Sequence, residues 1–189
     1  MSLLVIGVVI WCGAHLMPSV VPALRQHLIA AIGANRYRAF FALITLSSMA
    51  LIVIGWRSAP AAAVYFPPAW GRTAAVPLVF VAFVLFAASA LRTNIKRFIR
   101  HTQLTGVVVW AVAHLLSNGD GRSLVLFGCV GVWALLEMHF INRREGAWER
   151  PPPERFTAEL KPLLAGTLIF TVFFVLHPYL FGASPRLGG

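Results

Sequence analysis

Apolar runs about as long as a bilayer is thick recur along this chain and restrict its fold more than any other feature. A helix needs roughly 17–25 apolar residues to cross a bilayer, and six runs reach or approach that length. They cover residues 3–22, 39–56, 75–92, 104–118, 123–142 and 162–181. Only 12% of the 189 residues are charged, against about one quarter in soluble domains. The chain is therefore predicted to be embedded in a lipid bilayer.

The runs are continuous and do not alternate between polar and apolar residues, which is typical of helices and not of a membrane β-barrel. We expect an all-α integral membrane fold, a six-helix transmembrane bundle that forms a single domain over residues 1–189. Residues 104–118 are short for a span. Either this helix extends back through Ile99, or the turn that follows it enters the membrane.

The net charge of +10 follows a topological pattern. Four basic residues lie on one predicted side, namely Arg57, Arg72, Arg122 and Arg186. Twelve lie in the alternate connectors, namely Arg25, Arg36, Arg38, Arg92, Lys96, Arg97, Arg100, Arg143, Arg144, Arg150, Arg155 and Lys161. The positive-inside rule then places these connectors in the cytoplasm and both termini outside. We attribute the charge to topology and to contact with anionic lipid, and not to nucleic-acid binding.

A ten-residue segment occurs twice in the chain. Residues 7–16, GVVIWCGAHL, align with residues 106–115, GVVVWAVAHL, and seven of the ten positions are identical. The two copies are predicted to cross the membrane in opposite directions, as in a 3+3 inverted repeat with a two-fold axis in the membrane plane. At about 1.5 Å of rise per residue, His15 and His114 both come near the membrane centre. Gly7 and Gly106 are expected to permit close helix contacts.

Two histidines at matching depth suggest a shared central ligand. Neutral imidazoles can bind one iron from both sides, and the apolar macrocycle of haem suits the interior of a helix bundle. His15 and His114 are therefore candidate metal ligands, and candidate catalytic residues if the iron reacts. Trp11 and Trp110, one turn earlier on the same helix face, could pack on the macrocycle. The alternatives are histidines that only pack, and a proton or quinone site without iron.

Other polar residues near these histidines have two possible roles each. Cys12, three residues before His15, is either a second axial ligand or a small buried residue. Arg100 and His101, at the predicted cytoplasmic end of the fourth span, either hold propionates or a quinone oxygen, or only set the topology.

Residues in and just before the fifth span also carry predictions. Glu137 is the only acidic residue deep in a predicted span, and it could pair with His139, with a propionate or with nearby arginines. Asp120 is expected to cap this helix at its first turn, with Ser123 as the alternative cap.

Several segments resemble the NnrU membrane-protein family. The most specific is residues 100–120, which begin RHTQLTG and end WAVAHLLSNGD. Residues 123–128 and 133–135 continue the resemblance, and residues 13–18 and 36–38 fit it as well. It extends over nearly the whole chain.

The resemblance implies a bacterial inner-membrane protein linked to nitrite and nitric oxide metabolism in denitrification. A related branch is the 15-cis-zeta-carotene isomerase, a haem b enzyme with histidine ligands, whose ligand motifs would fall on His15 and His114. Haem b is thus the implied cofactor. The implied role is redox or electron transfer with a respiratory partner. The alternatives are cis–trans isomerisation of a polyene and a non-catalytic role as a membrane assembly partner.

The chain departs from these relatives at two positions. The isomerase branch carries a cysteine three residues before the second histidine, and Ala111 stands there in this chain. A ligand switch at that position is therefore impossible. Thr102 replaces the proline that usually follows the Arg-His pair of the family, which softens the entry to the helix.

Overall fold

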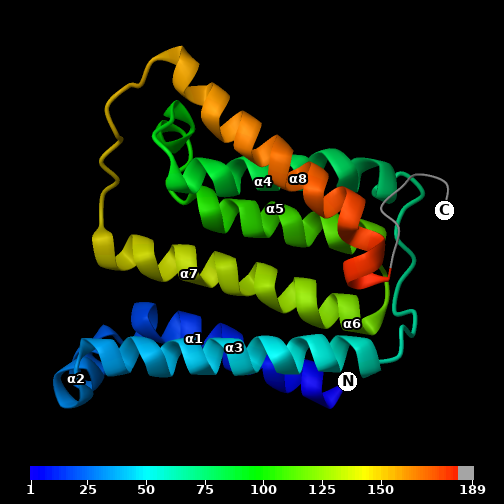
Figure 1. Ribbon diagram of the computed structural model, residues 1–189, viewed down its shortest axis with the longest axis horizontal. Helices are drawn as coiled ribbons and strands as arrows, with labels where there is room; N and C mark the ends of the chain where they lie inside the picture. The colour runs from blue at the N-terminus through cyan, green and yellow to red at the C-terminus, as the bar shows by residue number, and fades with distance from the viewer. Residues whose placement is uncertain (183–189) are drawn as a thin grey trace. The chain divides into compact units, whose positions relative to one another are not determined.

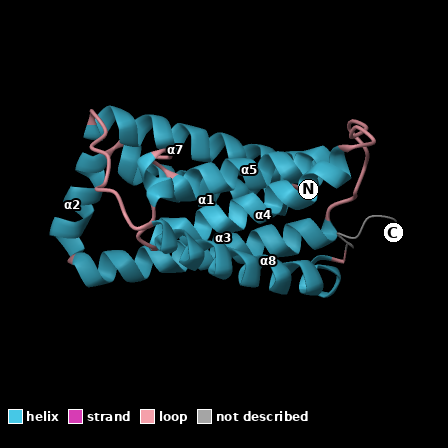
Figure 2. Ribbon diagram, turned by 90° about the horizontal axis from the view of Figure 1, so that it is seen from above, coloured by secondary structure: helices cyan, strands magenta, loops and turns pink. Residues whose placement is uncertain are grey.

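The computed structural model describes residues 1–182, and this part of the chain folds into helices without any β-strand (Figures 1 and 2). One isolated antiparallel bridge joins Ala63 to Asp120. The all-α prediction is therefore confirmed. Arg186, counted above among the outer basic residues, lies outside the described residues.

The helices follow the apolar runs closely. They are α1 (Ser2–Val20), α2 (Pro22–Ile32), α3 (Ala34–Ser58), α4 (Gly71–Ala90), α5 (Thr102–Ser117), α6 (Gly121–Ser123), α7 (Cys129–Glu145) and α8 (Leu160–Phe181). A π-helical turn, Leu124–Gly128, connects α6 to α7. Short 3-10 helices, Asn94–Arg97 and Phe156–Glu159, precede α5 and α8. Five helical segments of residues 1–182 are long and apolar enough to span a membrane, which makes this a multi-pass membrane protein.

The predicted fourth span corresponds to α5, which is shorter than the others. It has 16 residues, or about 24 Å of helix. The expected extension through Ile99 is wrong, because α5 begins at Thr102 and the residues before it form a short 3-10 helix followed by turns. The six-span prediction is thus supported for five segments, and α5 is a shorter apolar helix.

The helices belong to two compact units that interleave along the sequence. The first unit consists of residues 1–65 and 119–146, and the second begins with residues 66–118 and resumes at residue 147. The first therefore contains α1, α2, α3, α6 and α7, and the second contains α4, α5 and α8. These units do not coincide with the two halves of the chain that a 3+3 repeat would define.

In the first unit, α1 packs against both α3 and α7. Two glycines make its crossing with α3 close. A Cβ atom on Gly55 would lie 2.2 Å from the backbone N of Leu4, and one on Gly7 would lie 2.8 Å from the backbone N of Ile52. Small residues allow such approaches between membrane helices, where lipid tails remove the hydrophobic drive for association.

In the second unit, α4 packs against both α5 and α8. A Cβ atom on Gly166 of α8 would lie 2.7 Å from the Cα of Val84, and one on Gly106 of α5 would lie 2.7 Å from the ring of Phe86. Ala82 and Ala113 are fully buried in this unit. The close contacts expected at Gly7 and Gly106 are thus confirmed.

The outer helix faces are apolar and exposed. Leu43 and Leu46 of α3 are 62% and 65% exposed, and Leu164 and Leu168 of α8 are 67% and 66% exposed. Exposed apolar surface of this extent is typical of a membrane-contacting face and not of a soluble monomer.

Replacing Gly55 with alanine should destabilise the first unit. Its new methyl group would collide with the α1 backbone at Leu4, and overpacking of this kind costs about 1–3 kcal/mol. We expect a lower thermal unfolding midpoint for Gly55→Ala in detergent. Gly13→Ala is the matched control, because a Cβ there meets nothing within 4 Å. Equal midpoints for the two variants would contradict the proposed packing.

Candidate functional site

His15 lies in α1, and a backbone hydrogen bond fixes its ring. Its Nδ1 is 2.8 Å from the carbonyl oxygen of Trp11, one turn earlier. A carbonyl only accepts hydrogen bonds, so Nδ1 must donate the proton. The imidazole is therefore held in the tautomer whose lone pair is on Nε2, the nitrogen that remains available to act as a ligand.

His114 in α5 has the same local arrangement. Its Nδ1 donates to the carbonyl oxygen of Trp110, also at 2.8 Å. The indole of each tryptophan lies against the imidazole that follows it. The ring centroids are 4.1 Å apart for Trp11 and His15, and 4.7 Å apart for Trp110 and His114. Each tryptophan lies on the same helix face as its histidine, as predicted, and the repeat in sequence is also a repeat in side-chain geometry. Packing of the tryptophans on a macrocycle stays a prediction.

In the first unit, further aromatic rings surround His15. The ring of Phe41 in α3 is 5.2 Å from the imidazole and that of Trp133 in α7 is 5.8 Å away. Trp133 is only 9% exposed, yet its indole N–H finds no hydrogen-bond partner within residues 1–182. Leaving a buried donor unpaired costs about 1–3 kcal/mol. An acceptor on a group bound beside His15 would remove that cost.

Sequence reasoning did not select Phe41 or Trp133 as site residues. They reach His15 from two other helices, α3 and α7, and no spacing along the chain indicates that contact. The one available signal for Trp133 was its place in a segment that carries the family resemblance.

Cys12 is half-buried one turn before His15, on α1. Its thiol and that of Cys129 are both free. Its role as an alternative axial ligand stays a prediction.

Arg100 and His101 lie at the other end of α5 from His114. His101 occupies the N-cap position of this helix, and its carbonyl accepts a hydrogen bond from the Thr105 N–H at 2.8 Å. Thirteen residues separate His101 from His114, a rise of about 20 Å along the helix. This separation favours the topological role for Arg100 and His101 over the predicted binding of a group at His114.

Glu137 has a different partner from those predicted. The hydroxyl of Ser19 in α1 donates to its Oε1 atom. The predicted pairing with His139 is wrong, because His139 is exposed on α7 and its ring packs against Phe140. A spacing of 118 residues between Ser19 and Glu137 gave the sequence no means to indicate this contact.

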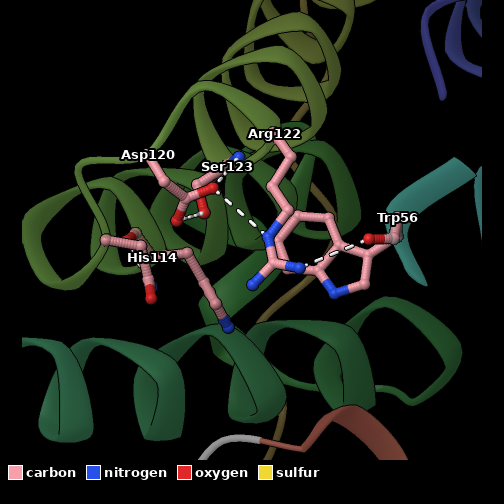
Figure 3. Close-up of polar contacts among 6 residues, drawn as sticks. Trp56, His114, Asp120, Arg122 and Ser123 are labelled. Atoms are coloured by element: carbon pink, nitrogen blue, oxygen red, sulfur yellow. Dashed lines mark hydrogen bonds and ion pairs between the residues drawn. The ribbon is translucent and has the colours of Figure 1, made fainter. Parts of the chain in front are cut away.

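Asp120 caps the helix that begins with α6, as predicted. Its carboxylate accepts hydrogen bonds from the backbone N–H of Ser123 at 3.1 Å and from the Ser123 hydroxyl at 2.7 Å. Arg122 pairs with the same carboxylate at 3.4 Å, donates to the Trp56 carbonyl at 3.3 Å and lies over the Trp56 ring (Figure 3). This network connects the end of α3 to the start of α6. Burial and the charge of Asp120 also raise the pKa of Tyr65, so that side chain stays a neutral phenol.

The end of α5 is closed by a similar local contact in the second unit. The side-chain amide of Asn118 donates to the carbonyl oxygen of His114 at 2.9 Å. Among residues 1–182, no three His, Cys, Asp or Glu side chains gather into a potential metal site.

Helices long and apolar enough to cross a bilayer, with a Trp-to-His motif repeated on two of the helices, define a multi-pass helical membrane protein. A family model described as NnrU protein matches residues 3–185, nearly the whole chain. The chain belongs to the NnrU family. Neither a curated protein nor a solved structure matches it.

Two substitutions at Asp120 should distinguish the contribution of its helix cap to stability from that of its ion pair with Arg122. Asp120→Ala removes the acceptor for Ser123, and loss of an N-cap costs about 0.5–2 kcal/mol. Asp120→Asn keeps an acceptor of similar capping strength but loses the charge facing Arg122. We expect the thermal unfolding midpoint to be highest for the wild type, lower for Asp120→Asn and lowest for Asp120→Ala. An Asp120→Asn midpoint as low as that of Asp120→Ala would show that the cap contributes little.

Proposed function

We propose that this protein binds haem b and that His15 and His114 are the residues that would hold its iron. The observation that carries the proposal is the hydrogen bond from each Nδ1 to a backbone carbonyl one turn earlier. Histidines that ligate metals commonly donate their other ring N–H to such an acceptor, which fixes the ring and raises its basicity. In both cases the acceptor is the carbonyl of a tryptophan. This shared geometry supports the same role, as a metal ligand, for both histidines.

The residues around His15 suit a flat apolar macrocycle. Trp11, Phe41 and Trp133 present ring surfaces there, and helix bundles commonly hold cofactors between facing side chains. The buried N–H of Trp133 lacks an acceptor among the described residues, and a propionate or other polar edge of the cofactor would provide one. Haem iron needs only one or two ligand atoms from a protein, and an imidazole nitrogen is a suitable ligand.

Ligation by two histidines favours electron transfer over reaction at the iron. When bound, haem supplies a one-electron couple between ferric and ferrous iron. The chain holds both imidazoles in a fixed tautomer and places aromatic rings around His15. Membership of the NnrU family supports a place in nitrite and nitric oxide metabolism. Turnover of a polyene such as zeta-carotene by the reduced protein would contradict this role.

The basic connectors support an orientation in the bacterial inner membrane with both termini outside. The α1–α3 connection contains α2 and Arg25, and α7 ends with Arg143 and Arg144 in its last turn. These helix ends lie on one predicted side. The positive-inside rule makes that side cytoplasmic.

The absorption spectrum of purified protein tests the two ligands. With haem supplied during expression, the wild type should show the bands of low-spin, six-coordinate iron. His15→Ala and His114→Ala should each lose them, because each removes one axial nitrogen. His139→Ala is the matched control, since His139 is exposed on α7. A colourless wild type, or an equal loss in His139→Ala, would refute haem ligation by this pair.

Trp133→Phe tests the predicted acceptor beside His15. The variant keeps an aromatic ring but loses the N–H, which has no partner among the described residues. The haem-free protein should therefore unfold at the same or a higher temperature. Haem should leave the variant about ten times faster, since a hydrogen bond to a charged group contributes about 1.5–3 kcal/mol.

Trp148→Phe, in the connector after α7, is the control for both measurements. A normal rate of haem loss in Trp133→Phe would exclude a hydrogen bond from Trp133 to the cofactor.

A further inference from the structure

A cavity opens in the first unit where the end of α1, the start of α2 and the end of α7 meet. Its volume is about 360 Å³, within the range typical of small-molecule sites, about 300–1,000 Å³. The residues that define its chemistry are Ser19, Pro22, Arg25, Gln26, Glu137 and Arg144. The cavity lies at the helix ends on the predicted cytoplasmic side.

A carboxylate forms the inner wall of this cavity and is only partly satisfied. Glu137 is 9% exposed, and its Oε1 accepts the hydroxyl hydrogen of Ser19. Its Oε2 is buried and finds no hydrogen-bond partner among the residues that the structure describes. Ionisable groups at such depth are rare, and they usually face a partner or a polar cavity. The Oε2 atom therefore lacks a donor, and the cavity is where a ligand could bring one.

Two guanidinium groups line the same cavity, and both are exposed. Each has another neighbour within the first unit. The Cζ of Arg25 lies 5.9 Å from the centroid of the Tyr37 ring, and the Nη2 of Arg144 lies 3.4 Å from Oε1 of Glu145. The site thus combines a buried negative charge with two accessible positive charges. Its charges would complement a ligand that has a cation at one end and an anion at the other.

We propose that this cavity binds a phosphoethanolamine group. The ammonium donates to Oε2 of Glu137, and the phosphate pairs with the guanidinium groups of Arg25 and Arg144. Arginine suits phosphate because its planar fork of donors matches the phosphate oxygens. An ammonium suits Glu137 because it carries a charge and N–H donors together. Choline carries the charge without an N–H, and glycerol carries a hydroxyl donor without the charge.

The position of α2 supports a phospholipid as the source of the group. Among its eleven residues none is buried, and apolar Leu24 is exposed together with Arg25 and Gln26. Short helices that mix apolar and basic residues in this way lie at the membrane interface. Headgroups of the cytoplasmic leaflet would then reach the cavity directly.

Native mass spectrometry of the full-length protein in detergent tests the proposal. The protein is mixed with phosphatidylethanolamine, phosphatidylcholine and phosphatidylglycerol that have identical acyl chains. We expect phosphatidylethanolamine to be retained about tenfold over the other two, equivalent to about 1.4 kcal/mol. Equal retention of the three lipids would overturn the proposal.

Added O-phosphoethanolamine identifies the source of the group. If it displaces the bound lipid, the headgroup chemistry is sufficient by itself and a free small molecule can occupy the site. If it does not, the acyl chains are also required and the ligand is the membrane lipid. Both results uphold the phosphoethanolamine chemistry, provided that the preference for phosphatidylethanolamine holds.

Two sets of variants assign the contacts. Glu137→Gln should lower the preference for phosphatidylethanolamine over phosphatidylcholine to about one, and Glu149→Gln, an exposed carboxylate, should leave it unchanged. The double variant Arg25→Ala/Arg144→Ala should reduce retention of all three lipids.

The double variant also tests the proposal if Glu137→Gln fails to fold, because both arginines are exposed. Arg143→Ala, in the same helical turn as Arg144, is its control. Lipid retention unchanged in the double variant would refute the phosphate contact.

Discussion

The hydrogen bond from an imidazole Nδ1 to the carbonyl one turn earlier is the interaction on which the site depends. A polar donor inside a bilayer must be satisfied by the chain itself, and the preceding turn of the same helix provides an acceptor. His15 and His114 both use it, and in both the carbonyl belongs to a tryptophan. This one contact fixes the ring, selects its tautomer and leaves the basic nitrogen on Nε2. The proposed ligation of iron follows directly from it.

Close helix packing provides the rigid support for these rings. The contact of Gly55 with the Leu4 backbone fixes α3 against α1, and the contact of Gly166 with Val84 fixes α8 against α4. Each unit therefore has one central helix, α1 or α4, with a partner on either side. The same packing of α1 against α7 encloses His15 with Trp133 and brings Ser19 to Glu137. The aromatic surroundings of His15 and the proposed lipid site would thus rest on the same pair of helices.

The sequence could predict whatever depends on the bilayer or on neighbours within a helix. Apolar run lengths predicted the spans within a few residues, and the Trp-to-His spacing predicted that Trp11 and His15 share a helix face. Contacts between distant segments were not predictable. The start of α5 was missed because the turn before it is held by Glu159, which accepts hydrogen bonds from Thr93 and Asn94. The partner of Glu137 was missed because nothing along α7 indicates a serine at the end of α1.

The proposed ligation of haem iron by His15 and His114 is tested most directly by magnetic circular dichroism of the ferric protein in the near infrared. The charge-transfer band in that region reports which two side chains bind haem iron. A band characteristic of two neutral imidazoles, with one iron per polypeptide, is the expected result. A band from thiolate, methionine or water on one side, or no iron at all, would contradict it.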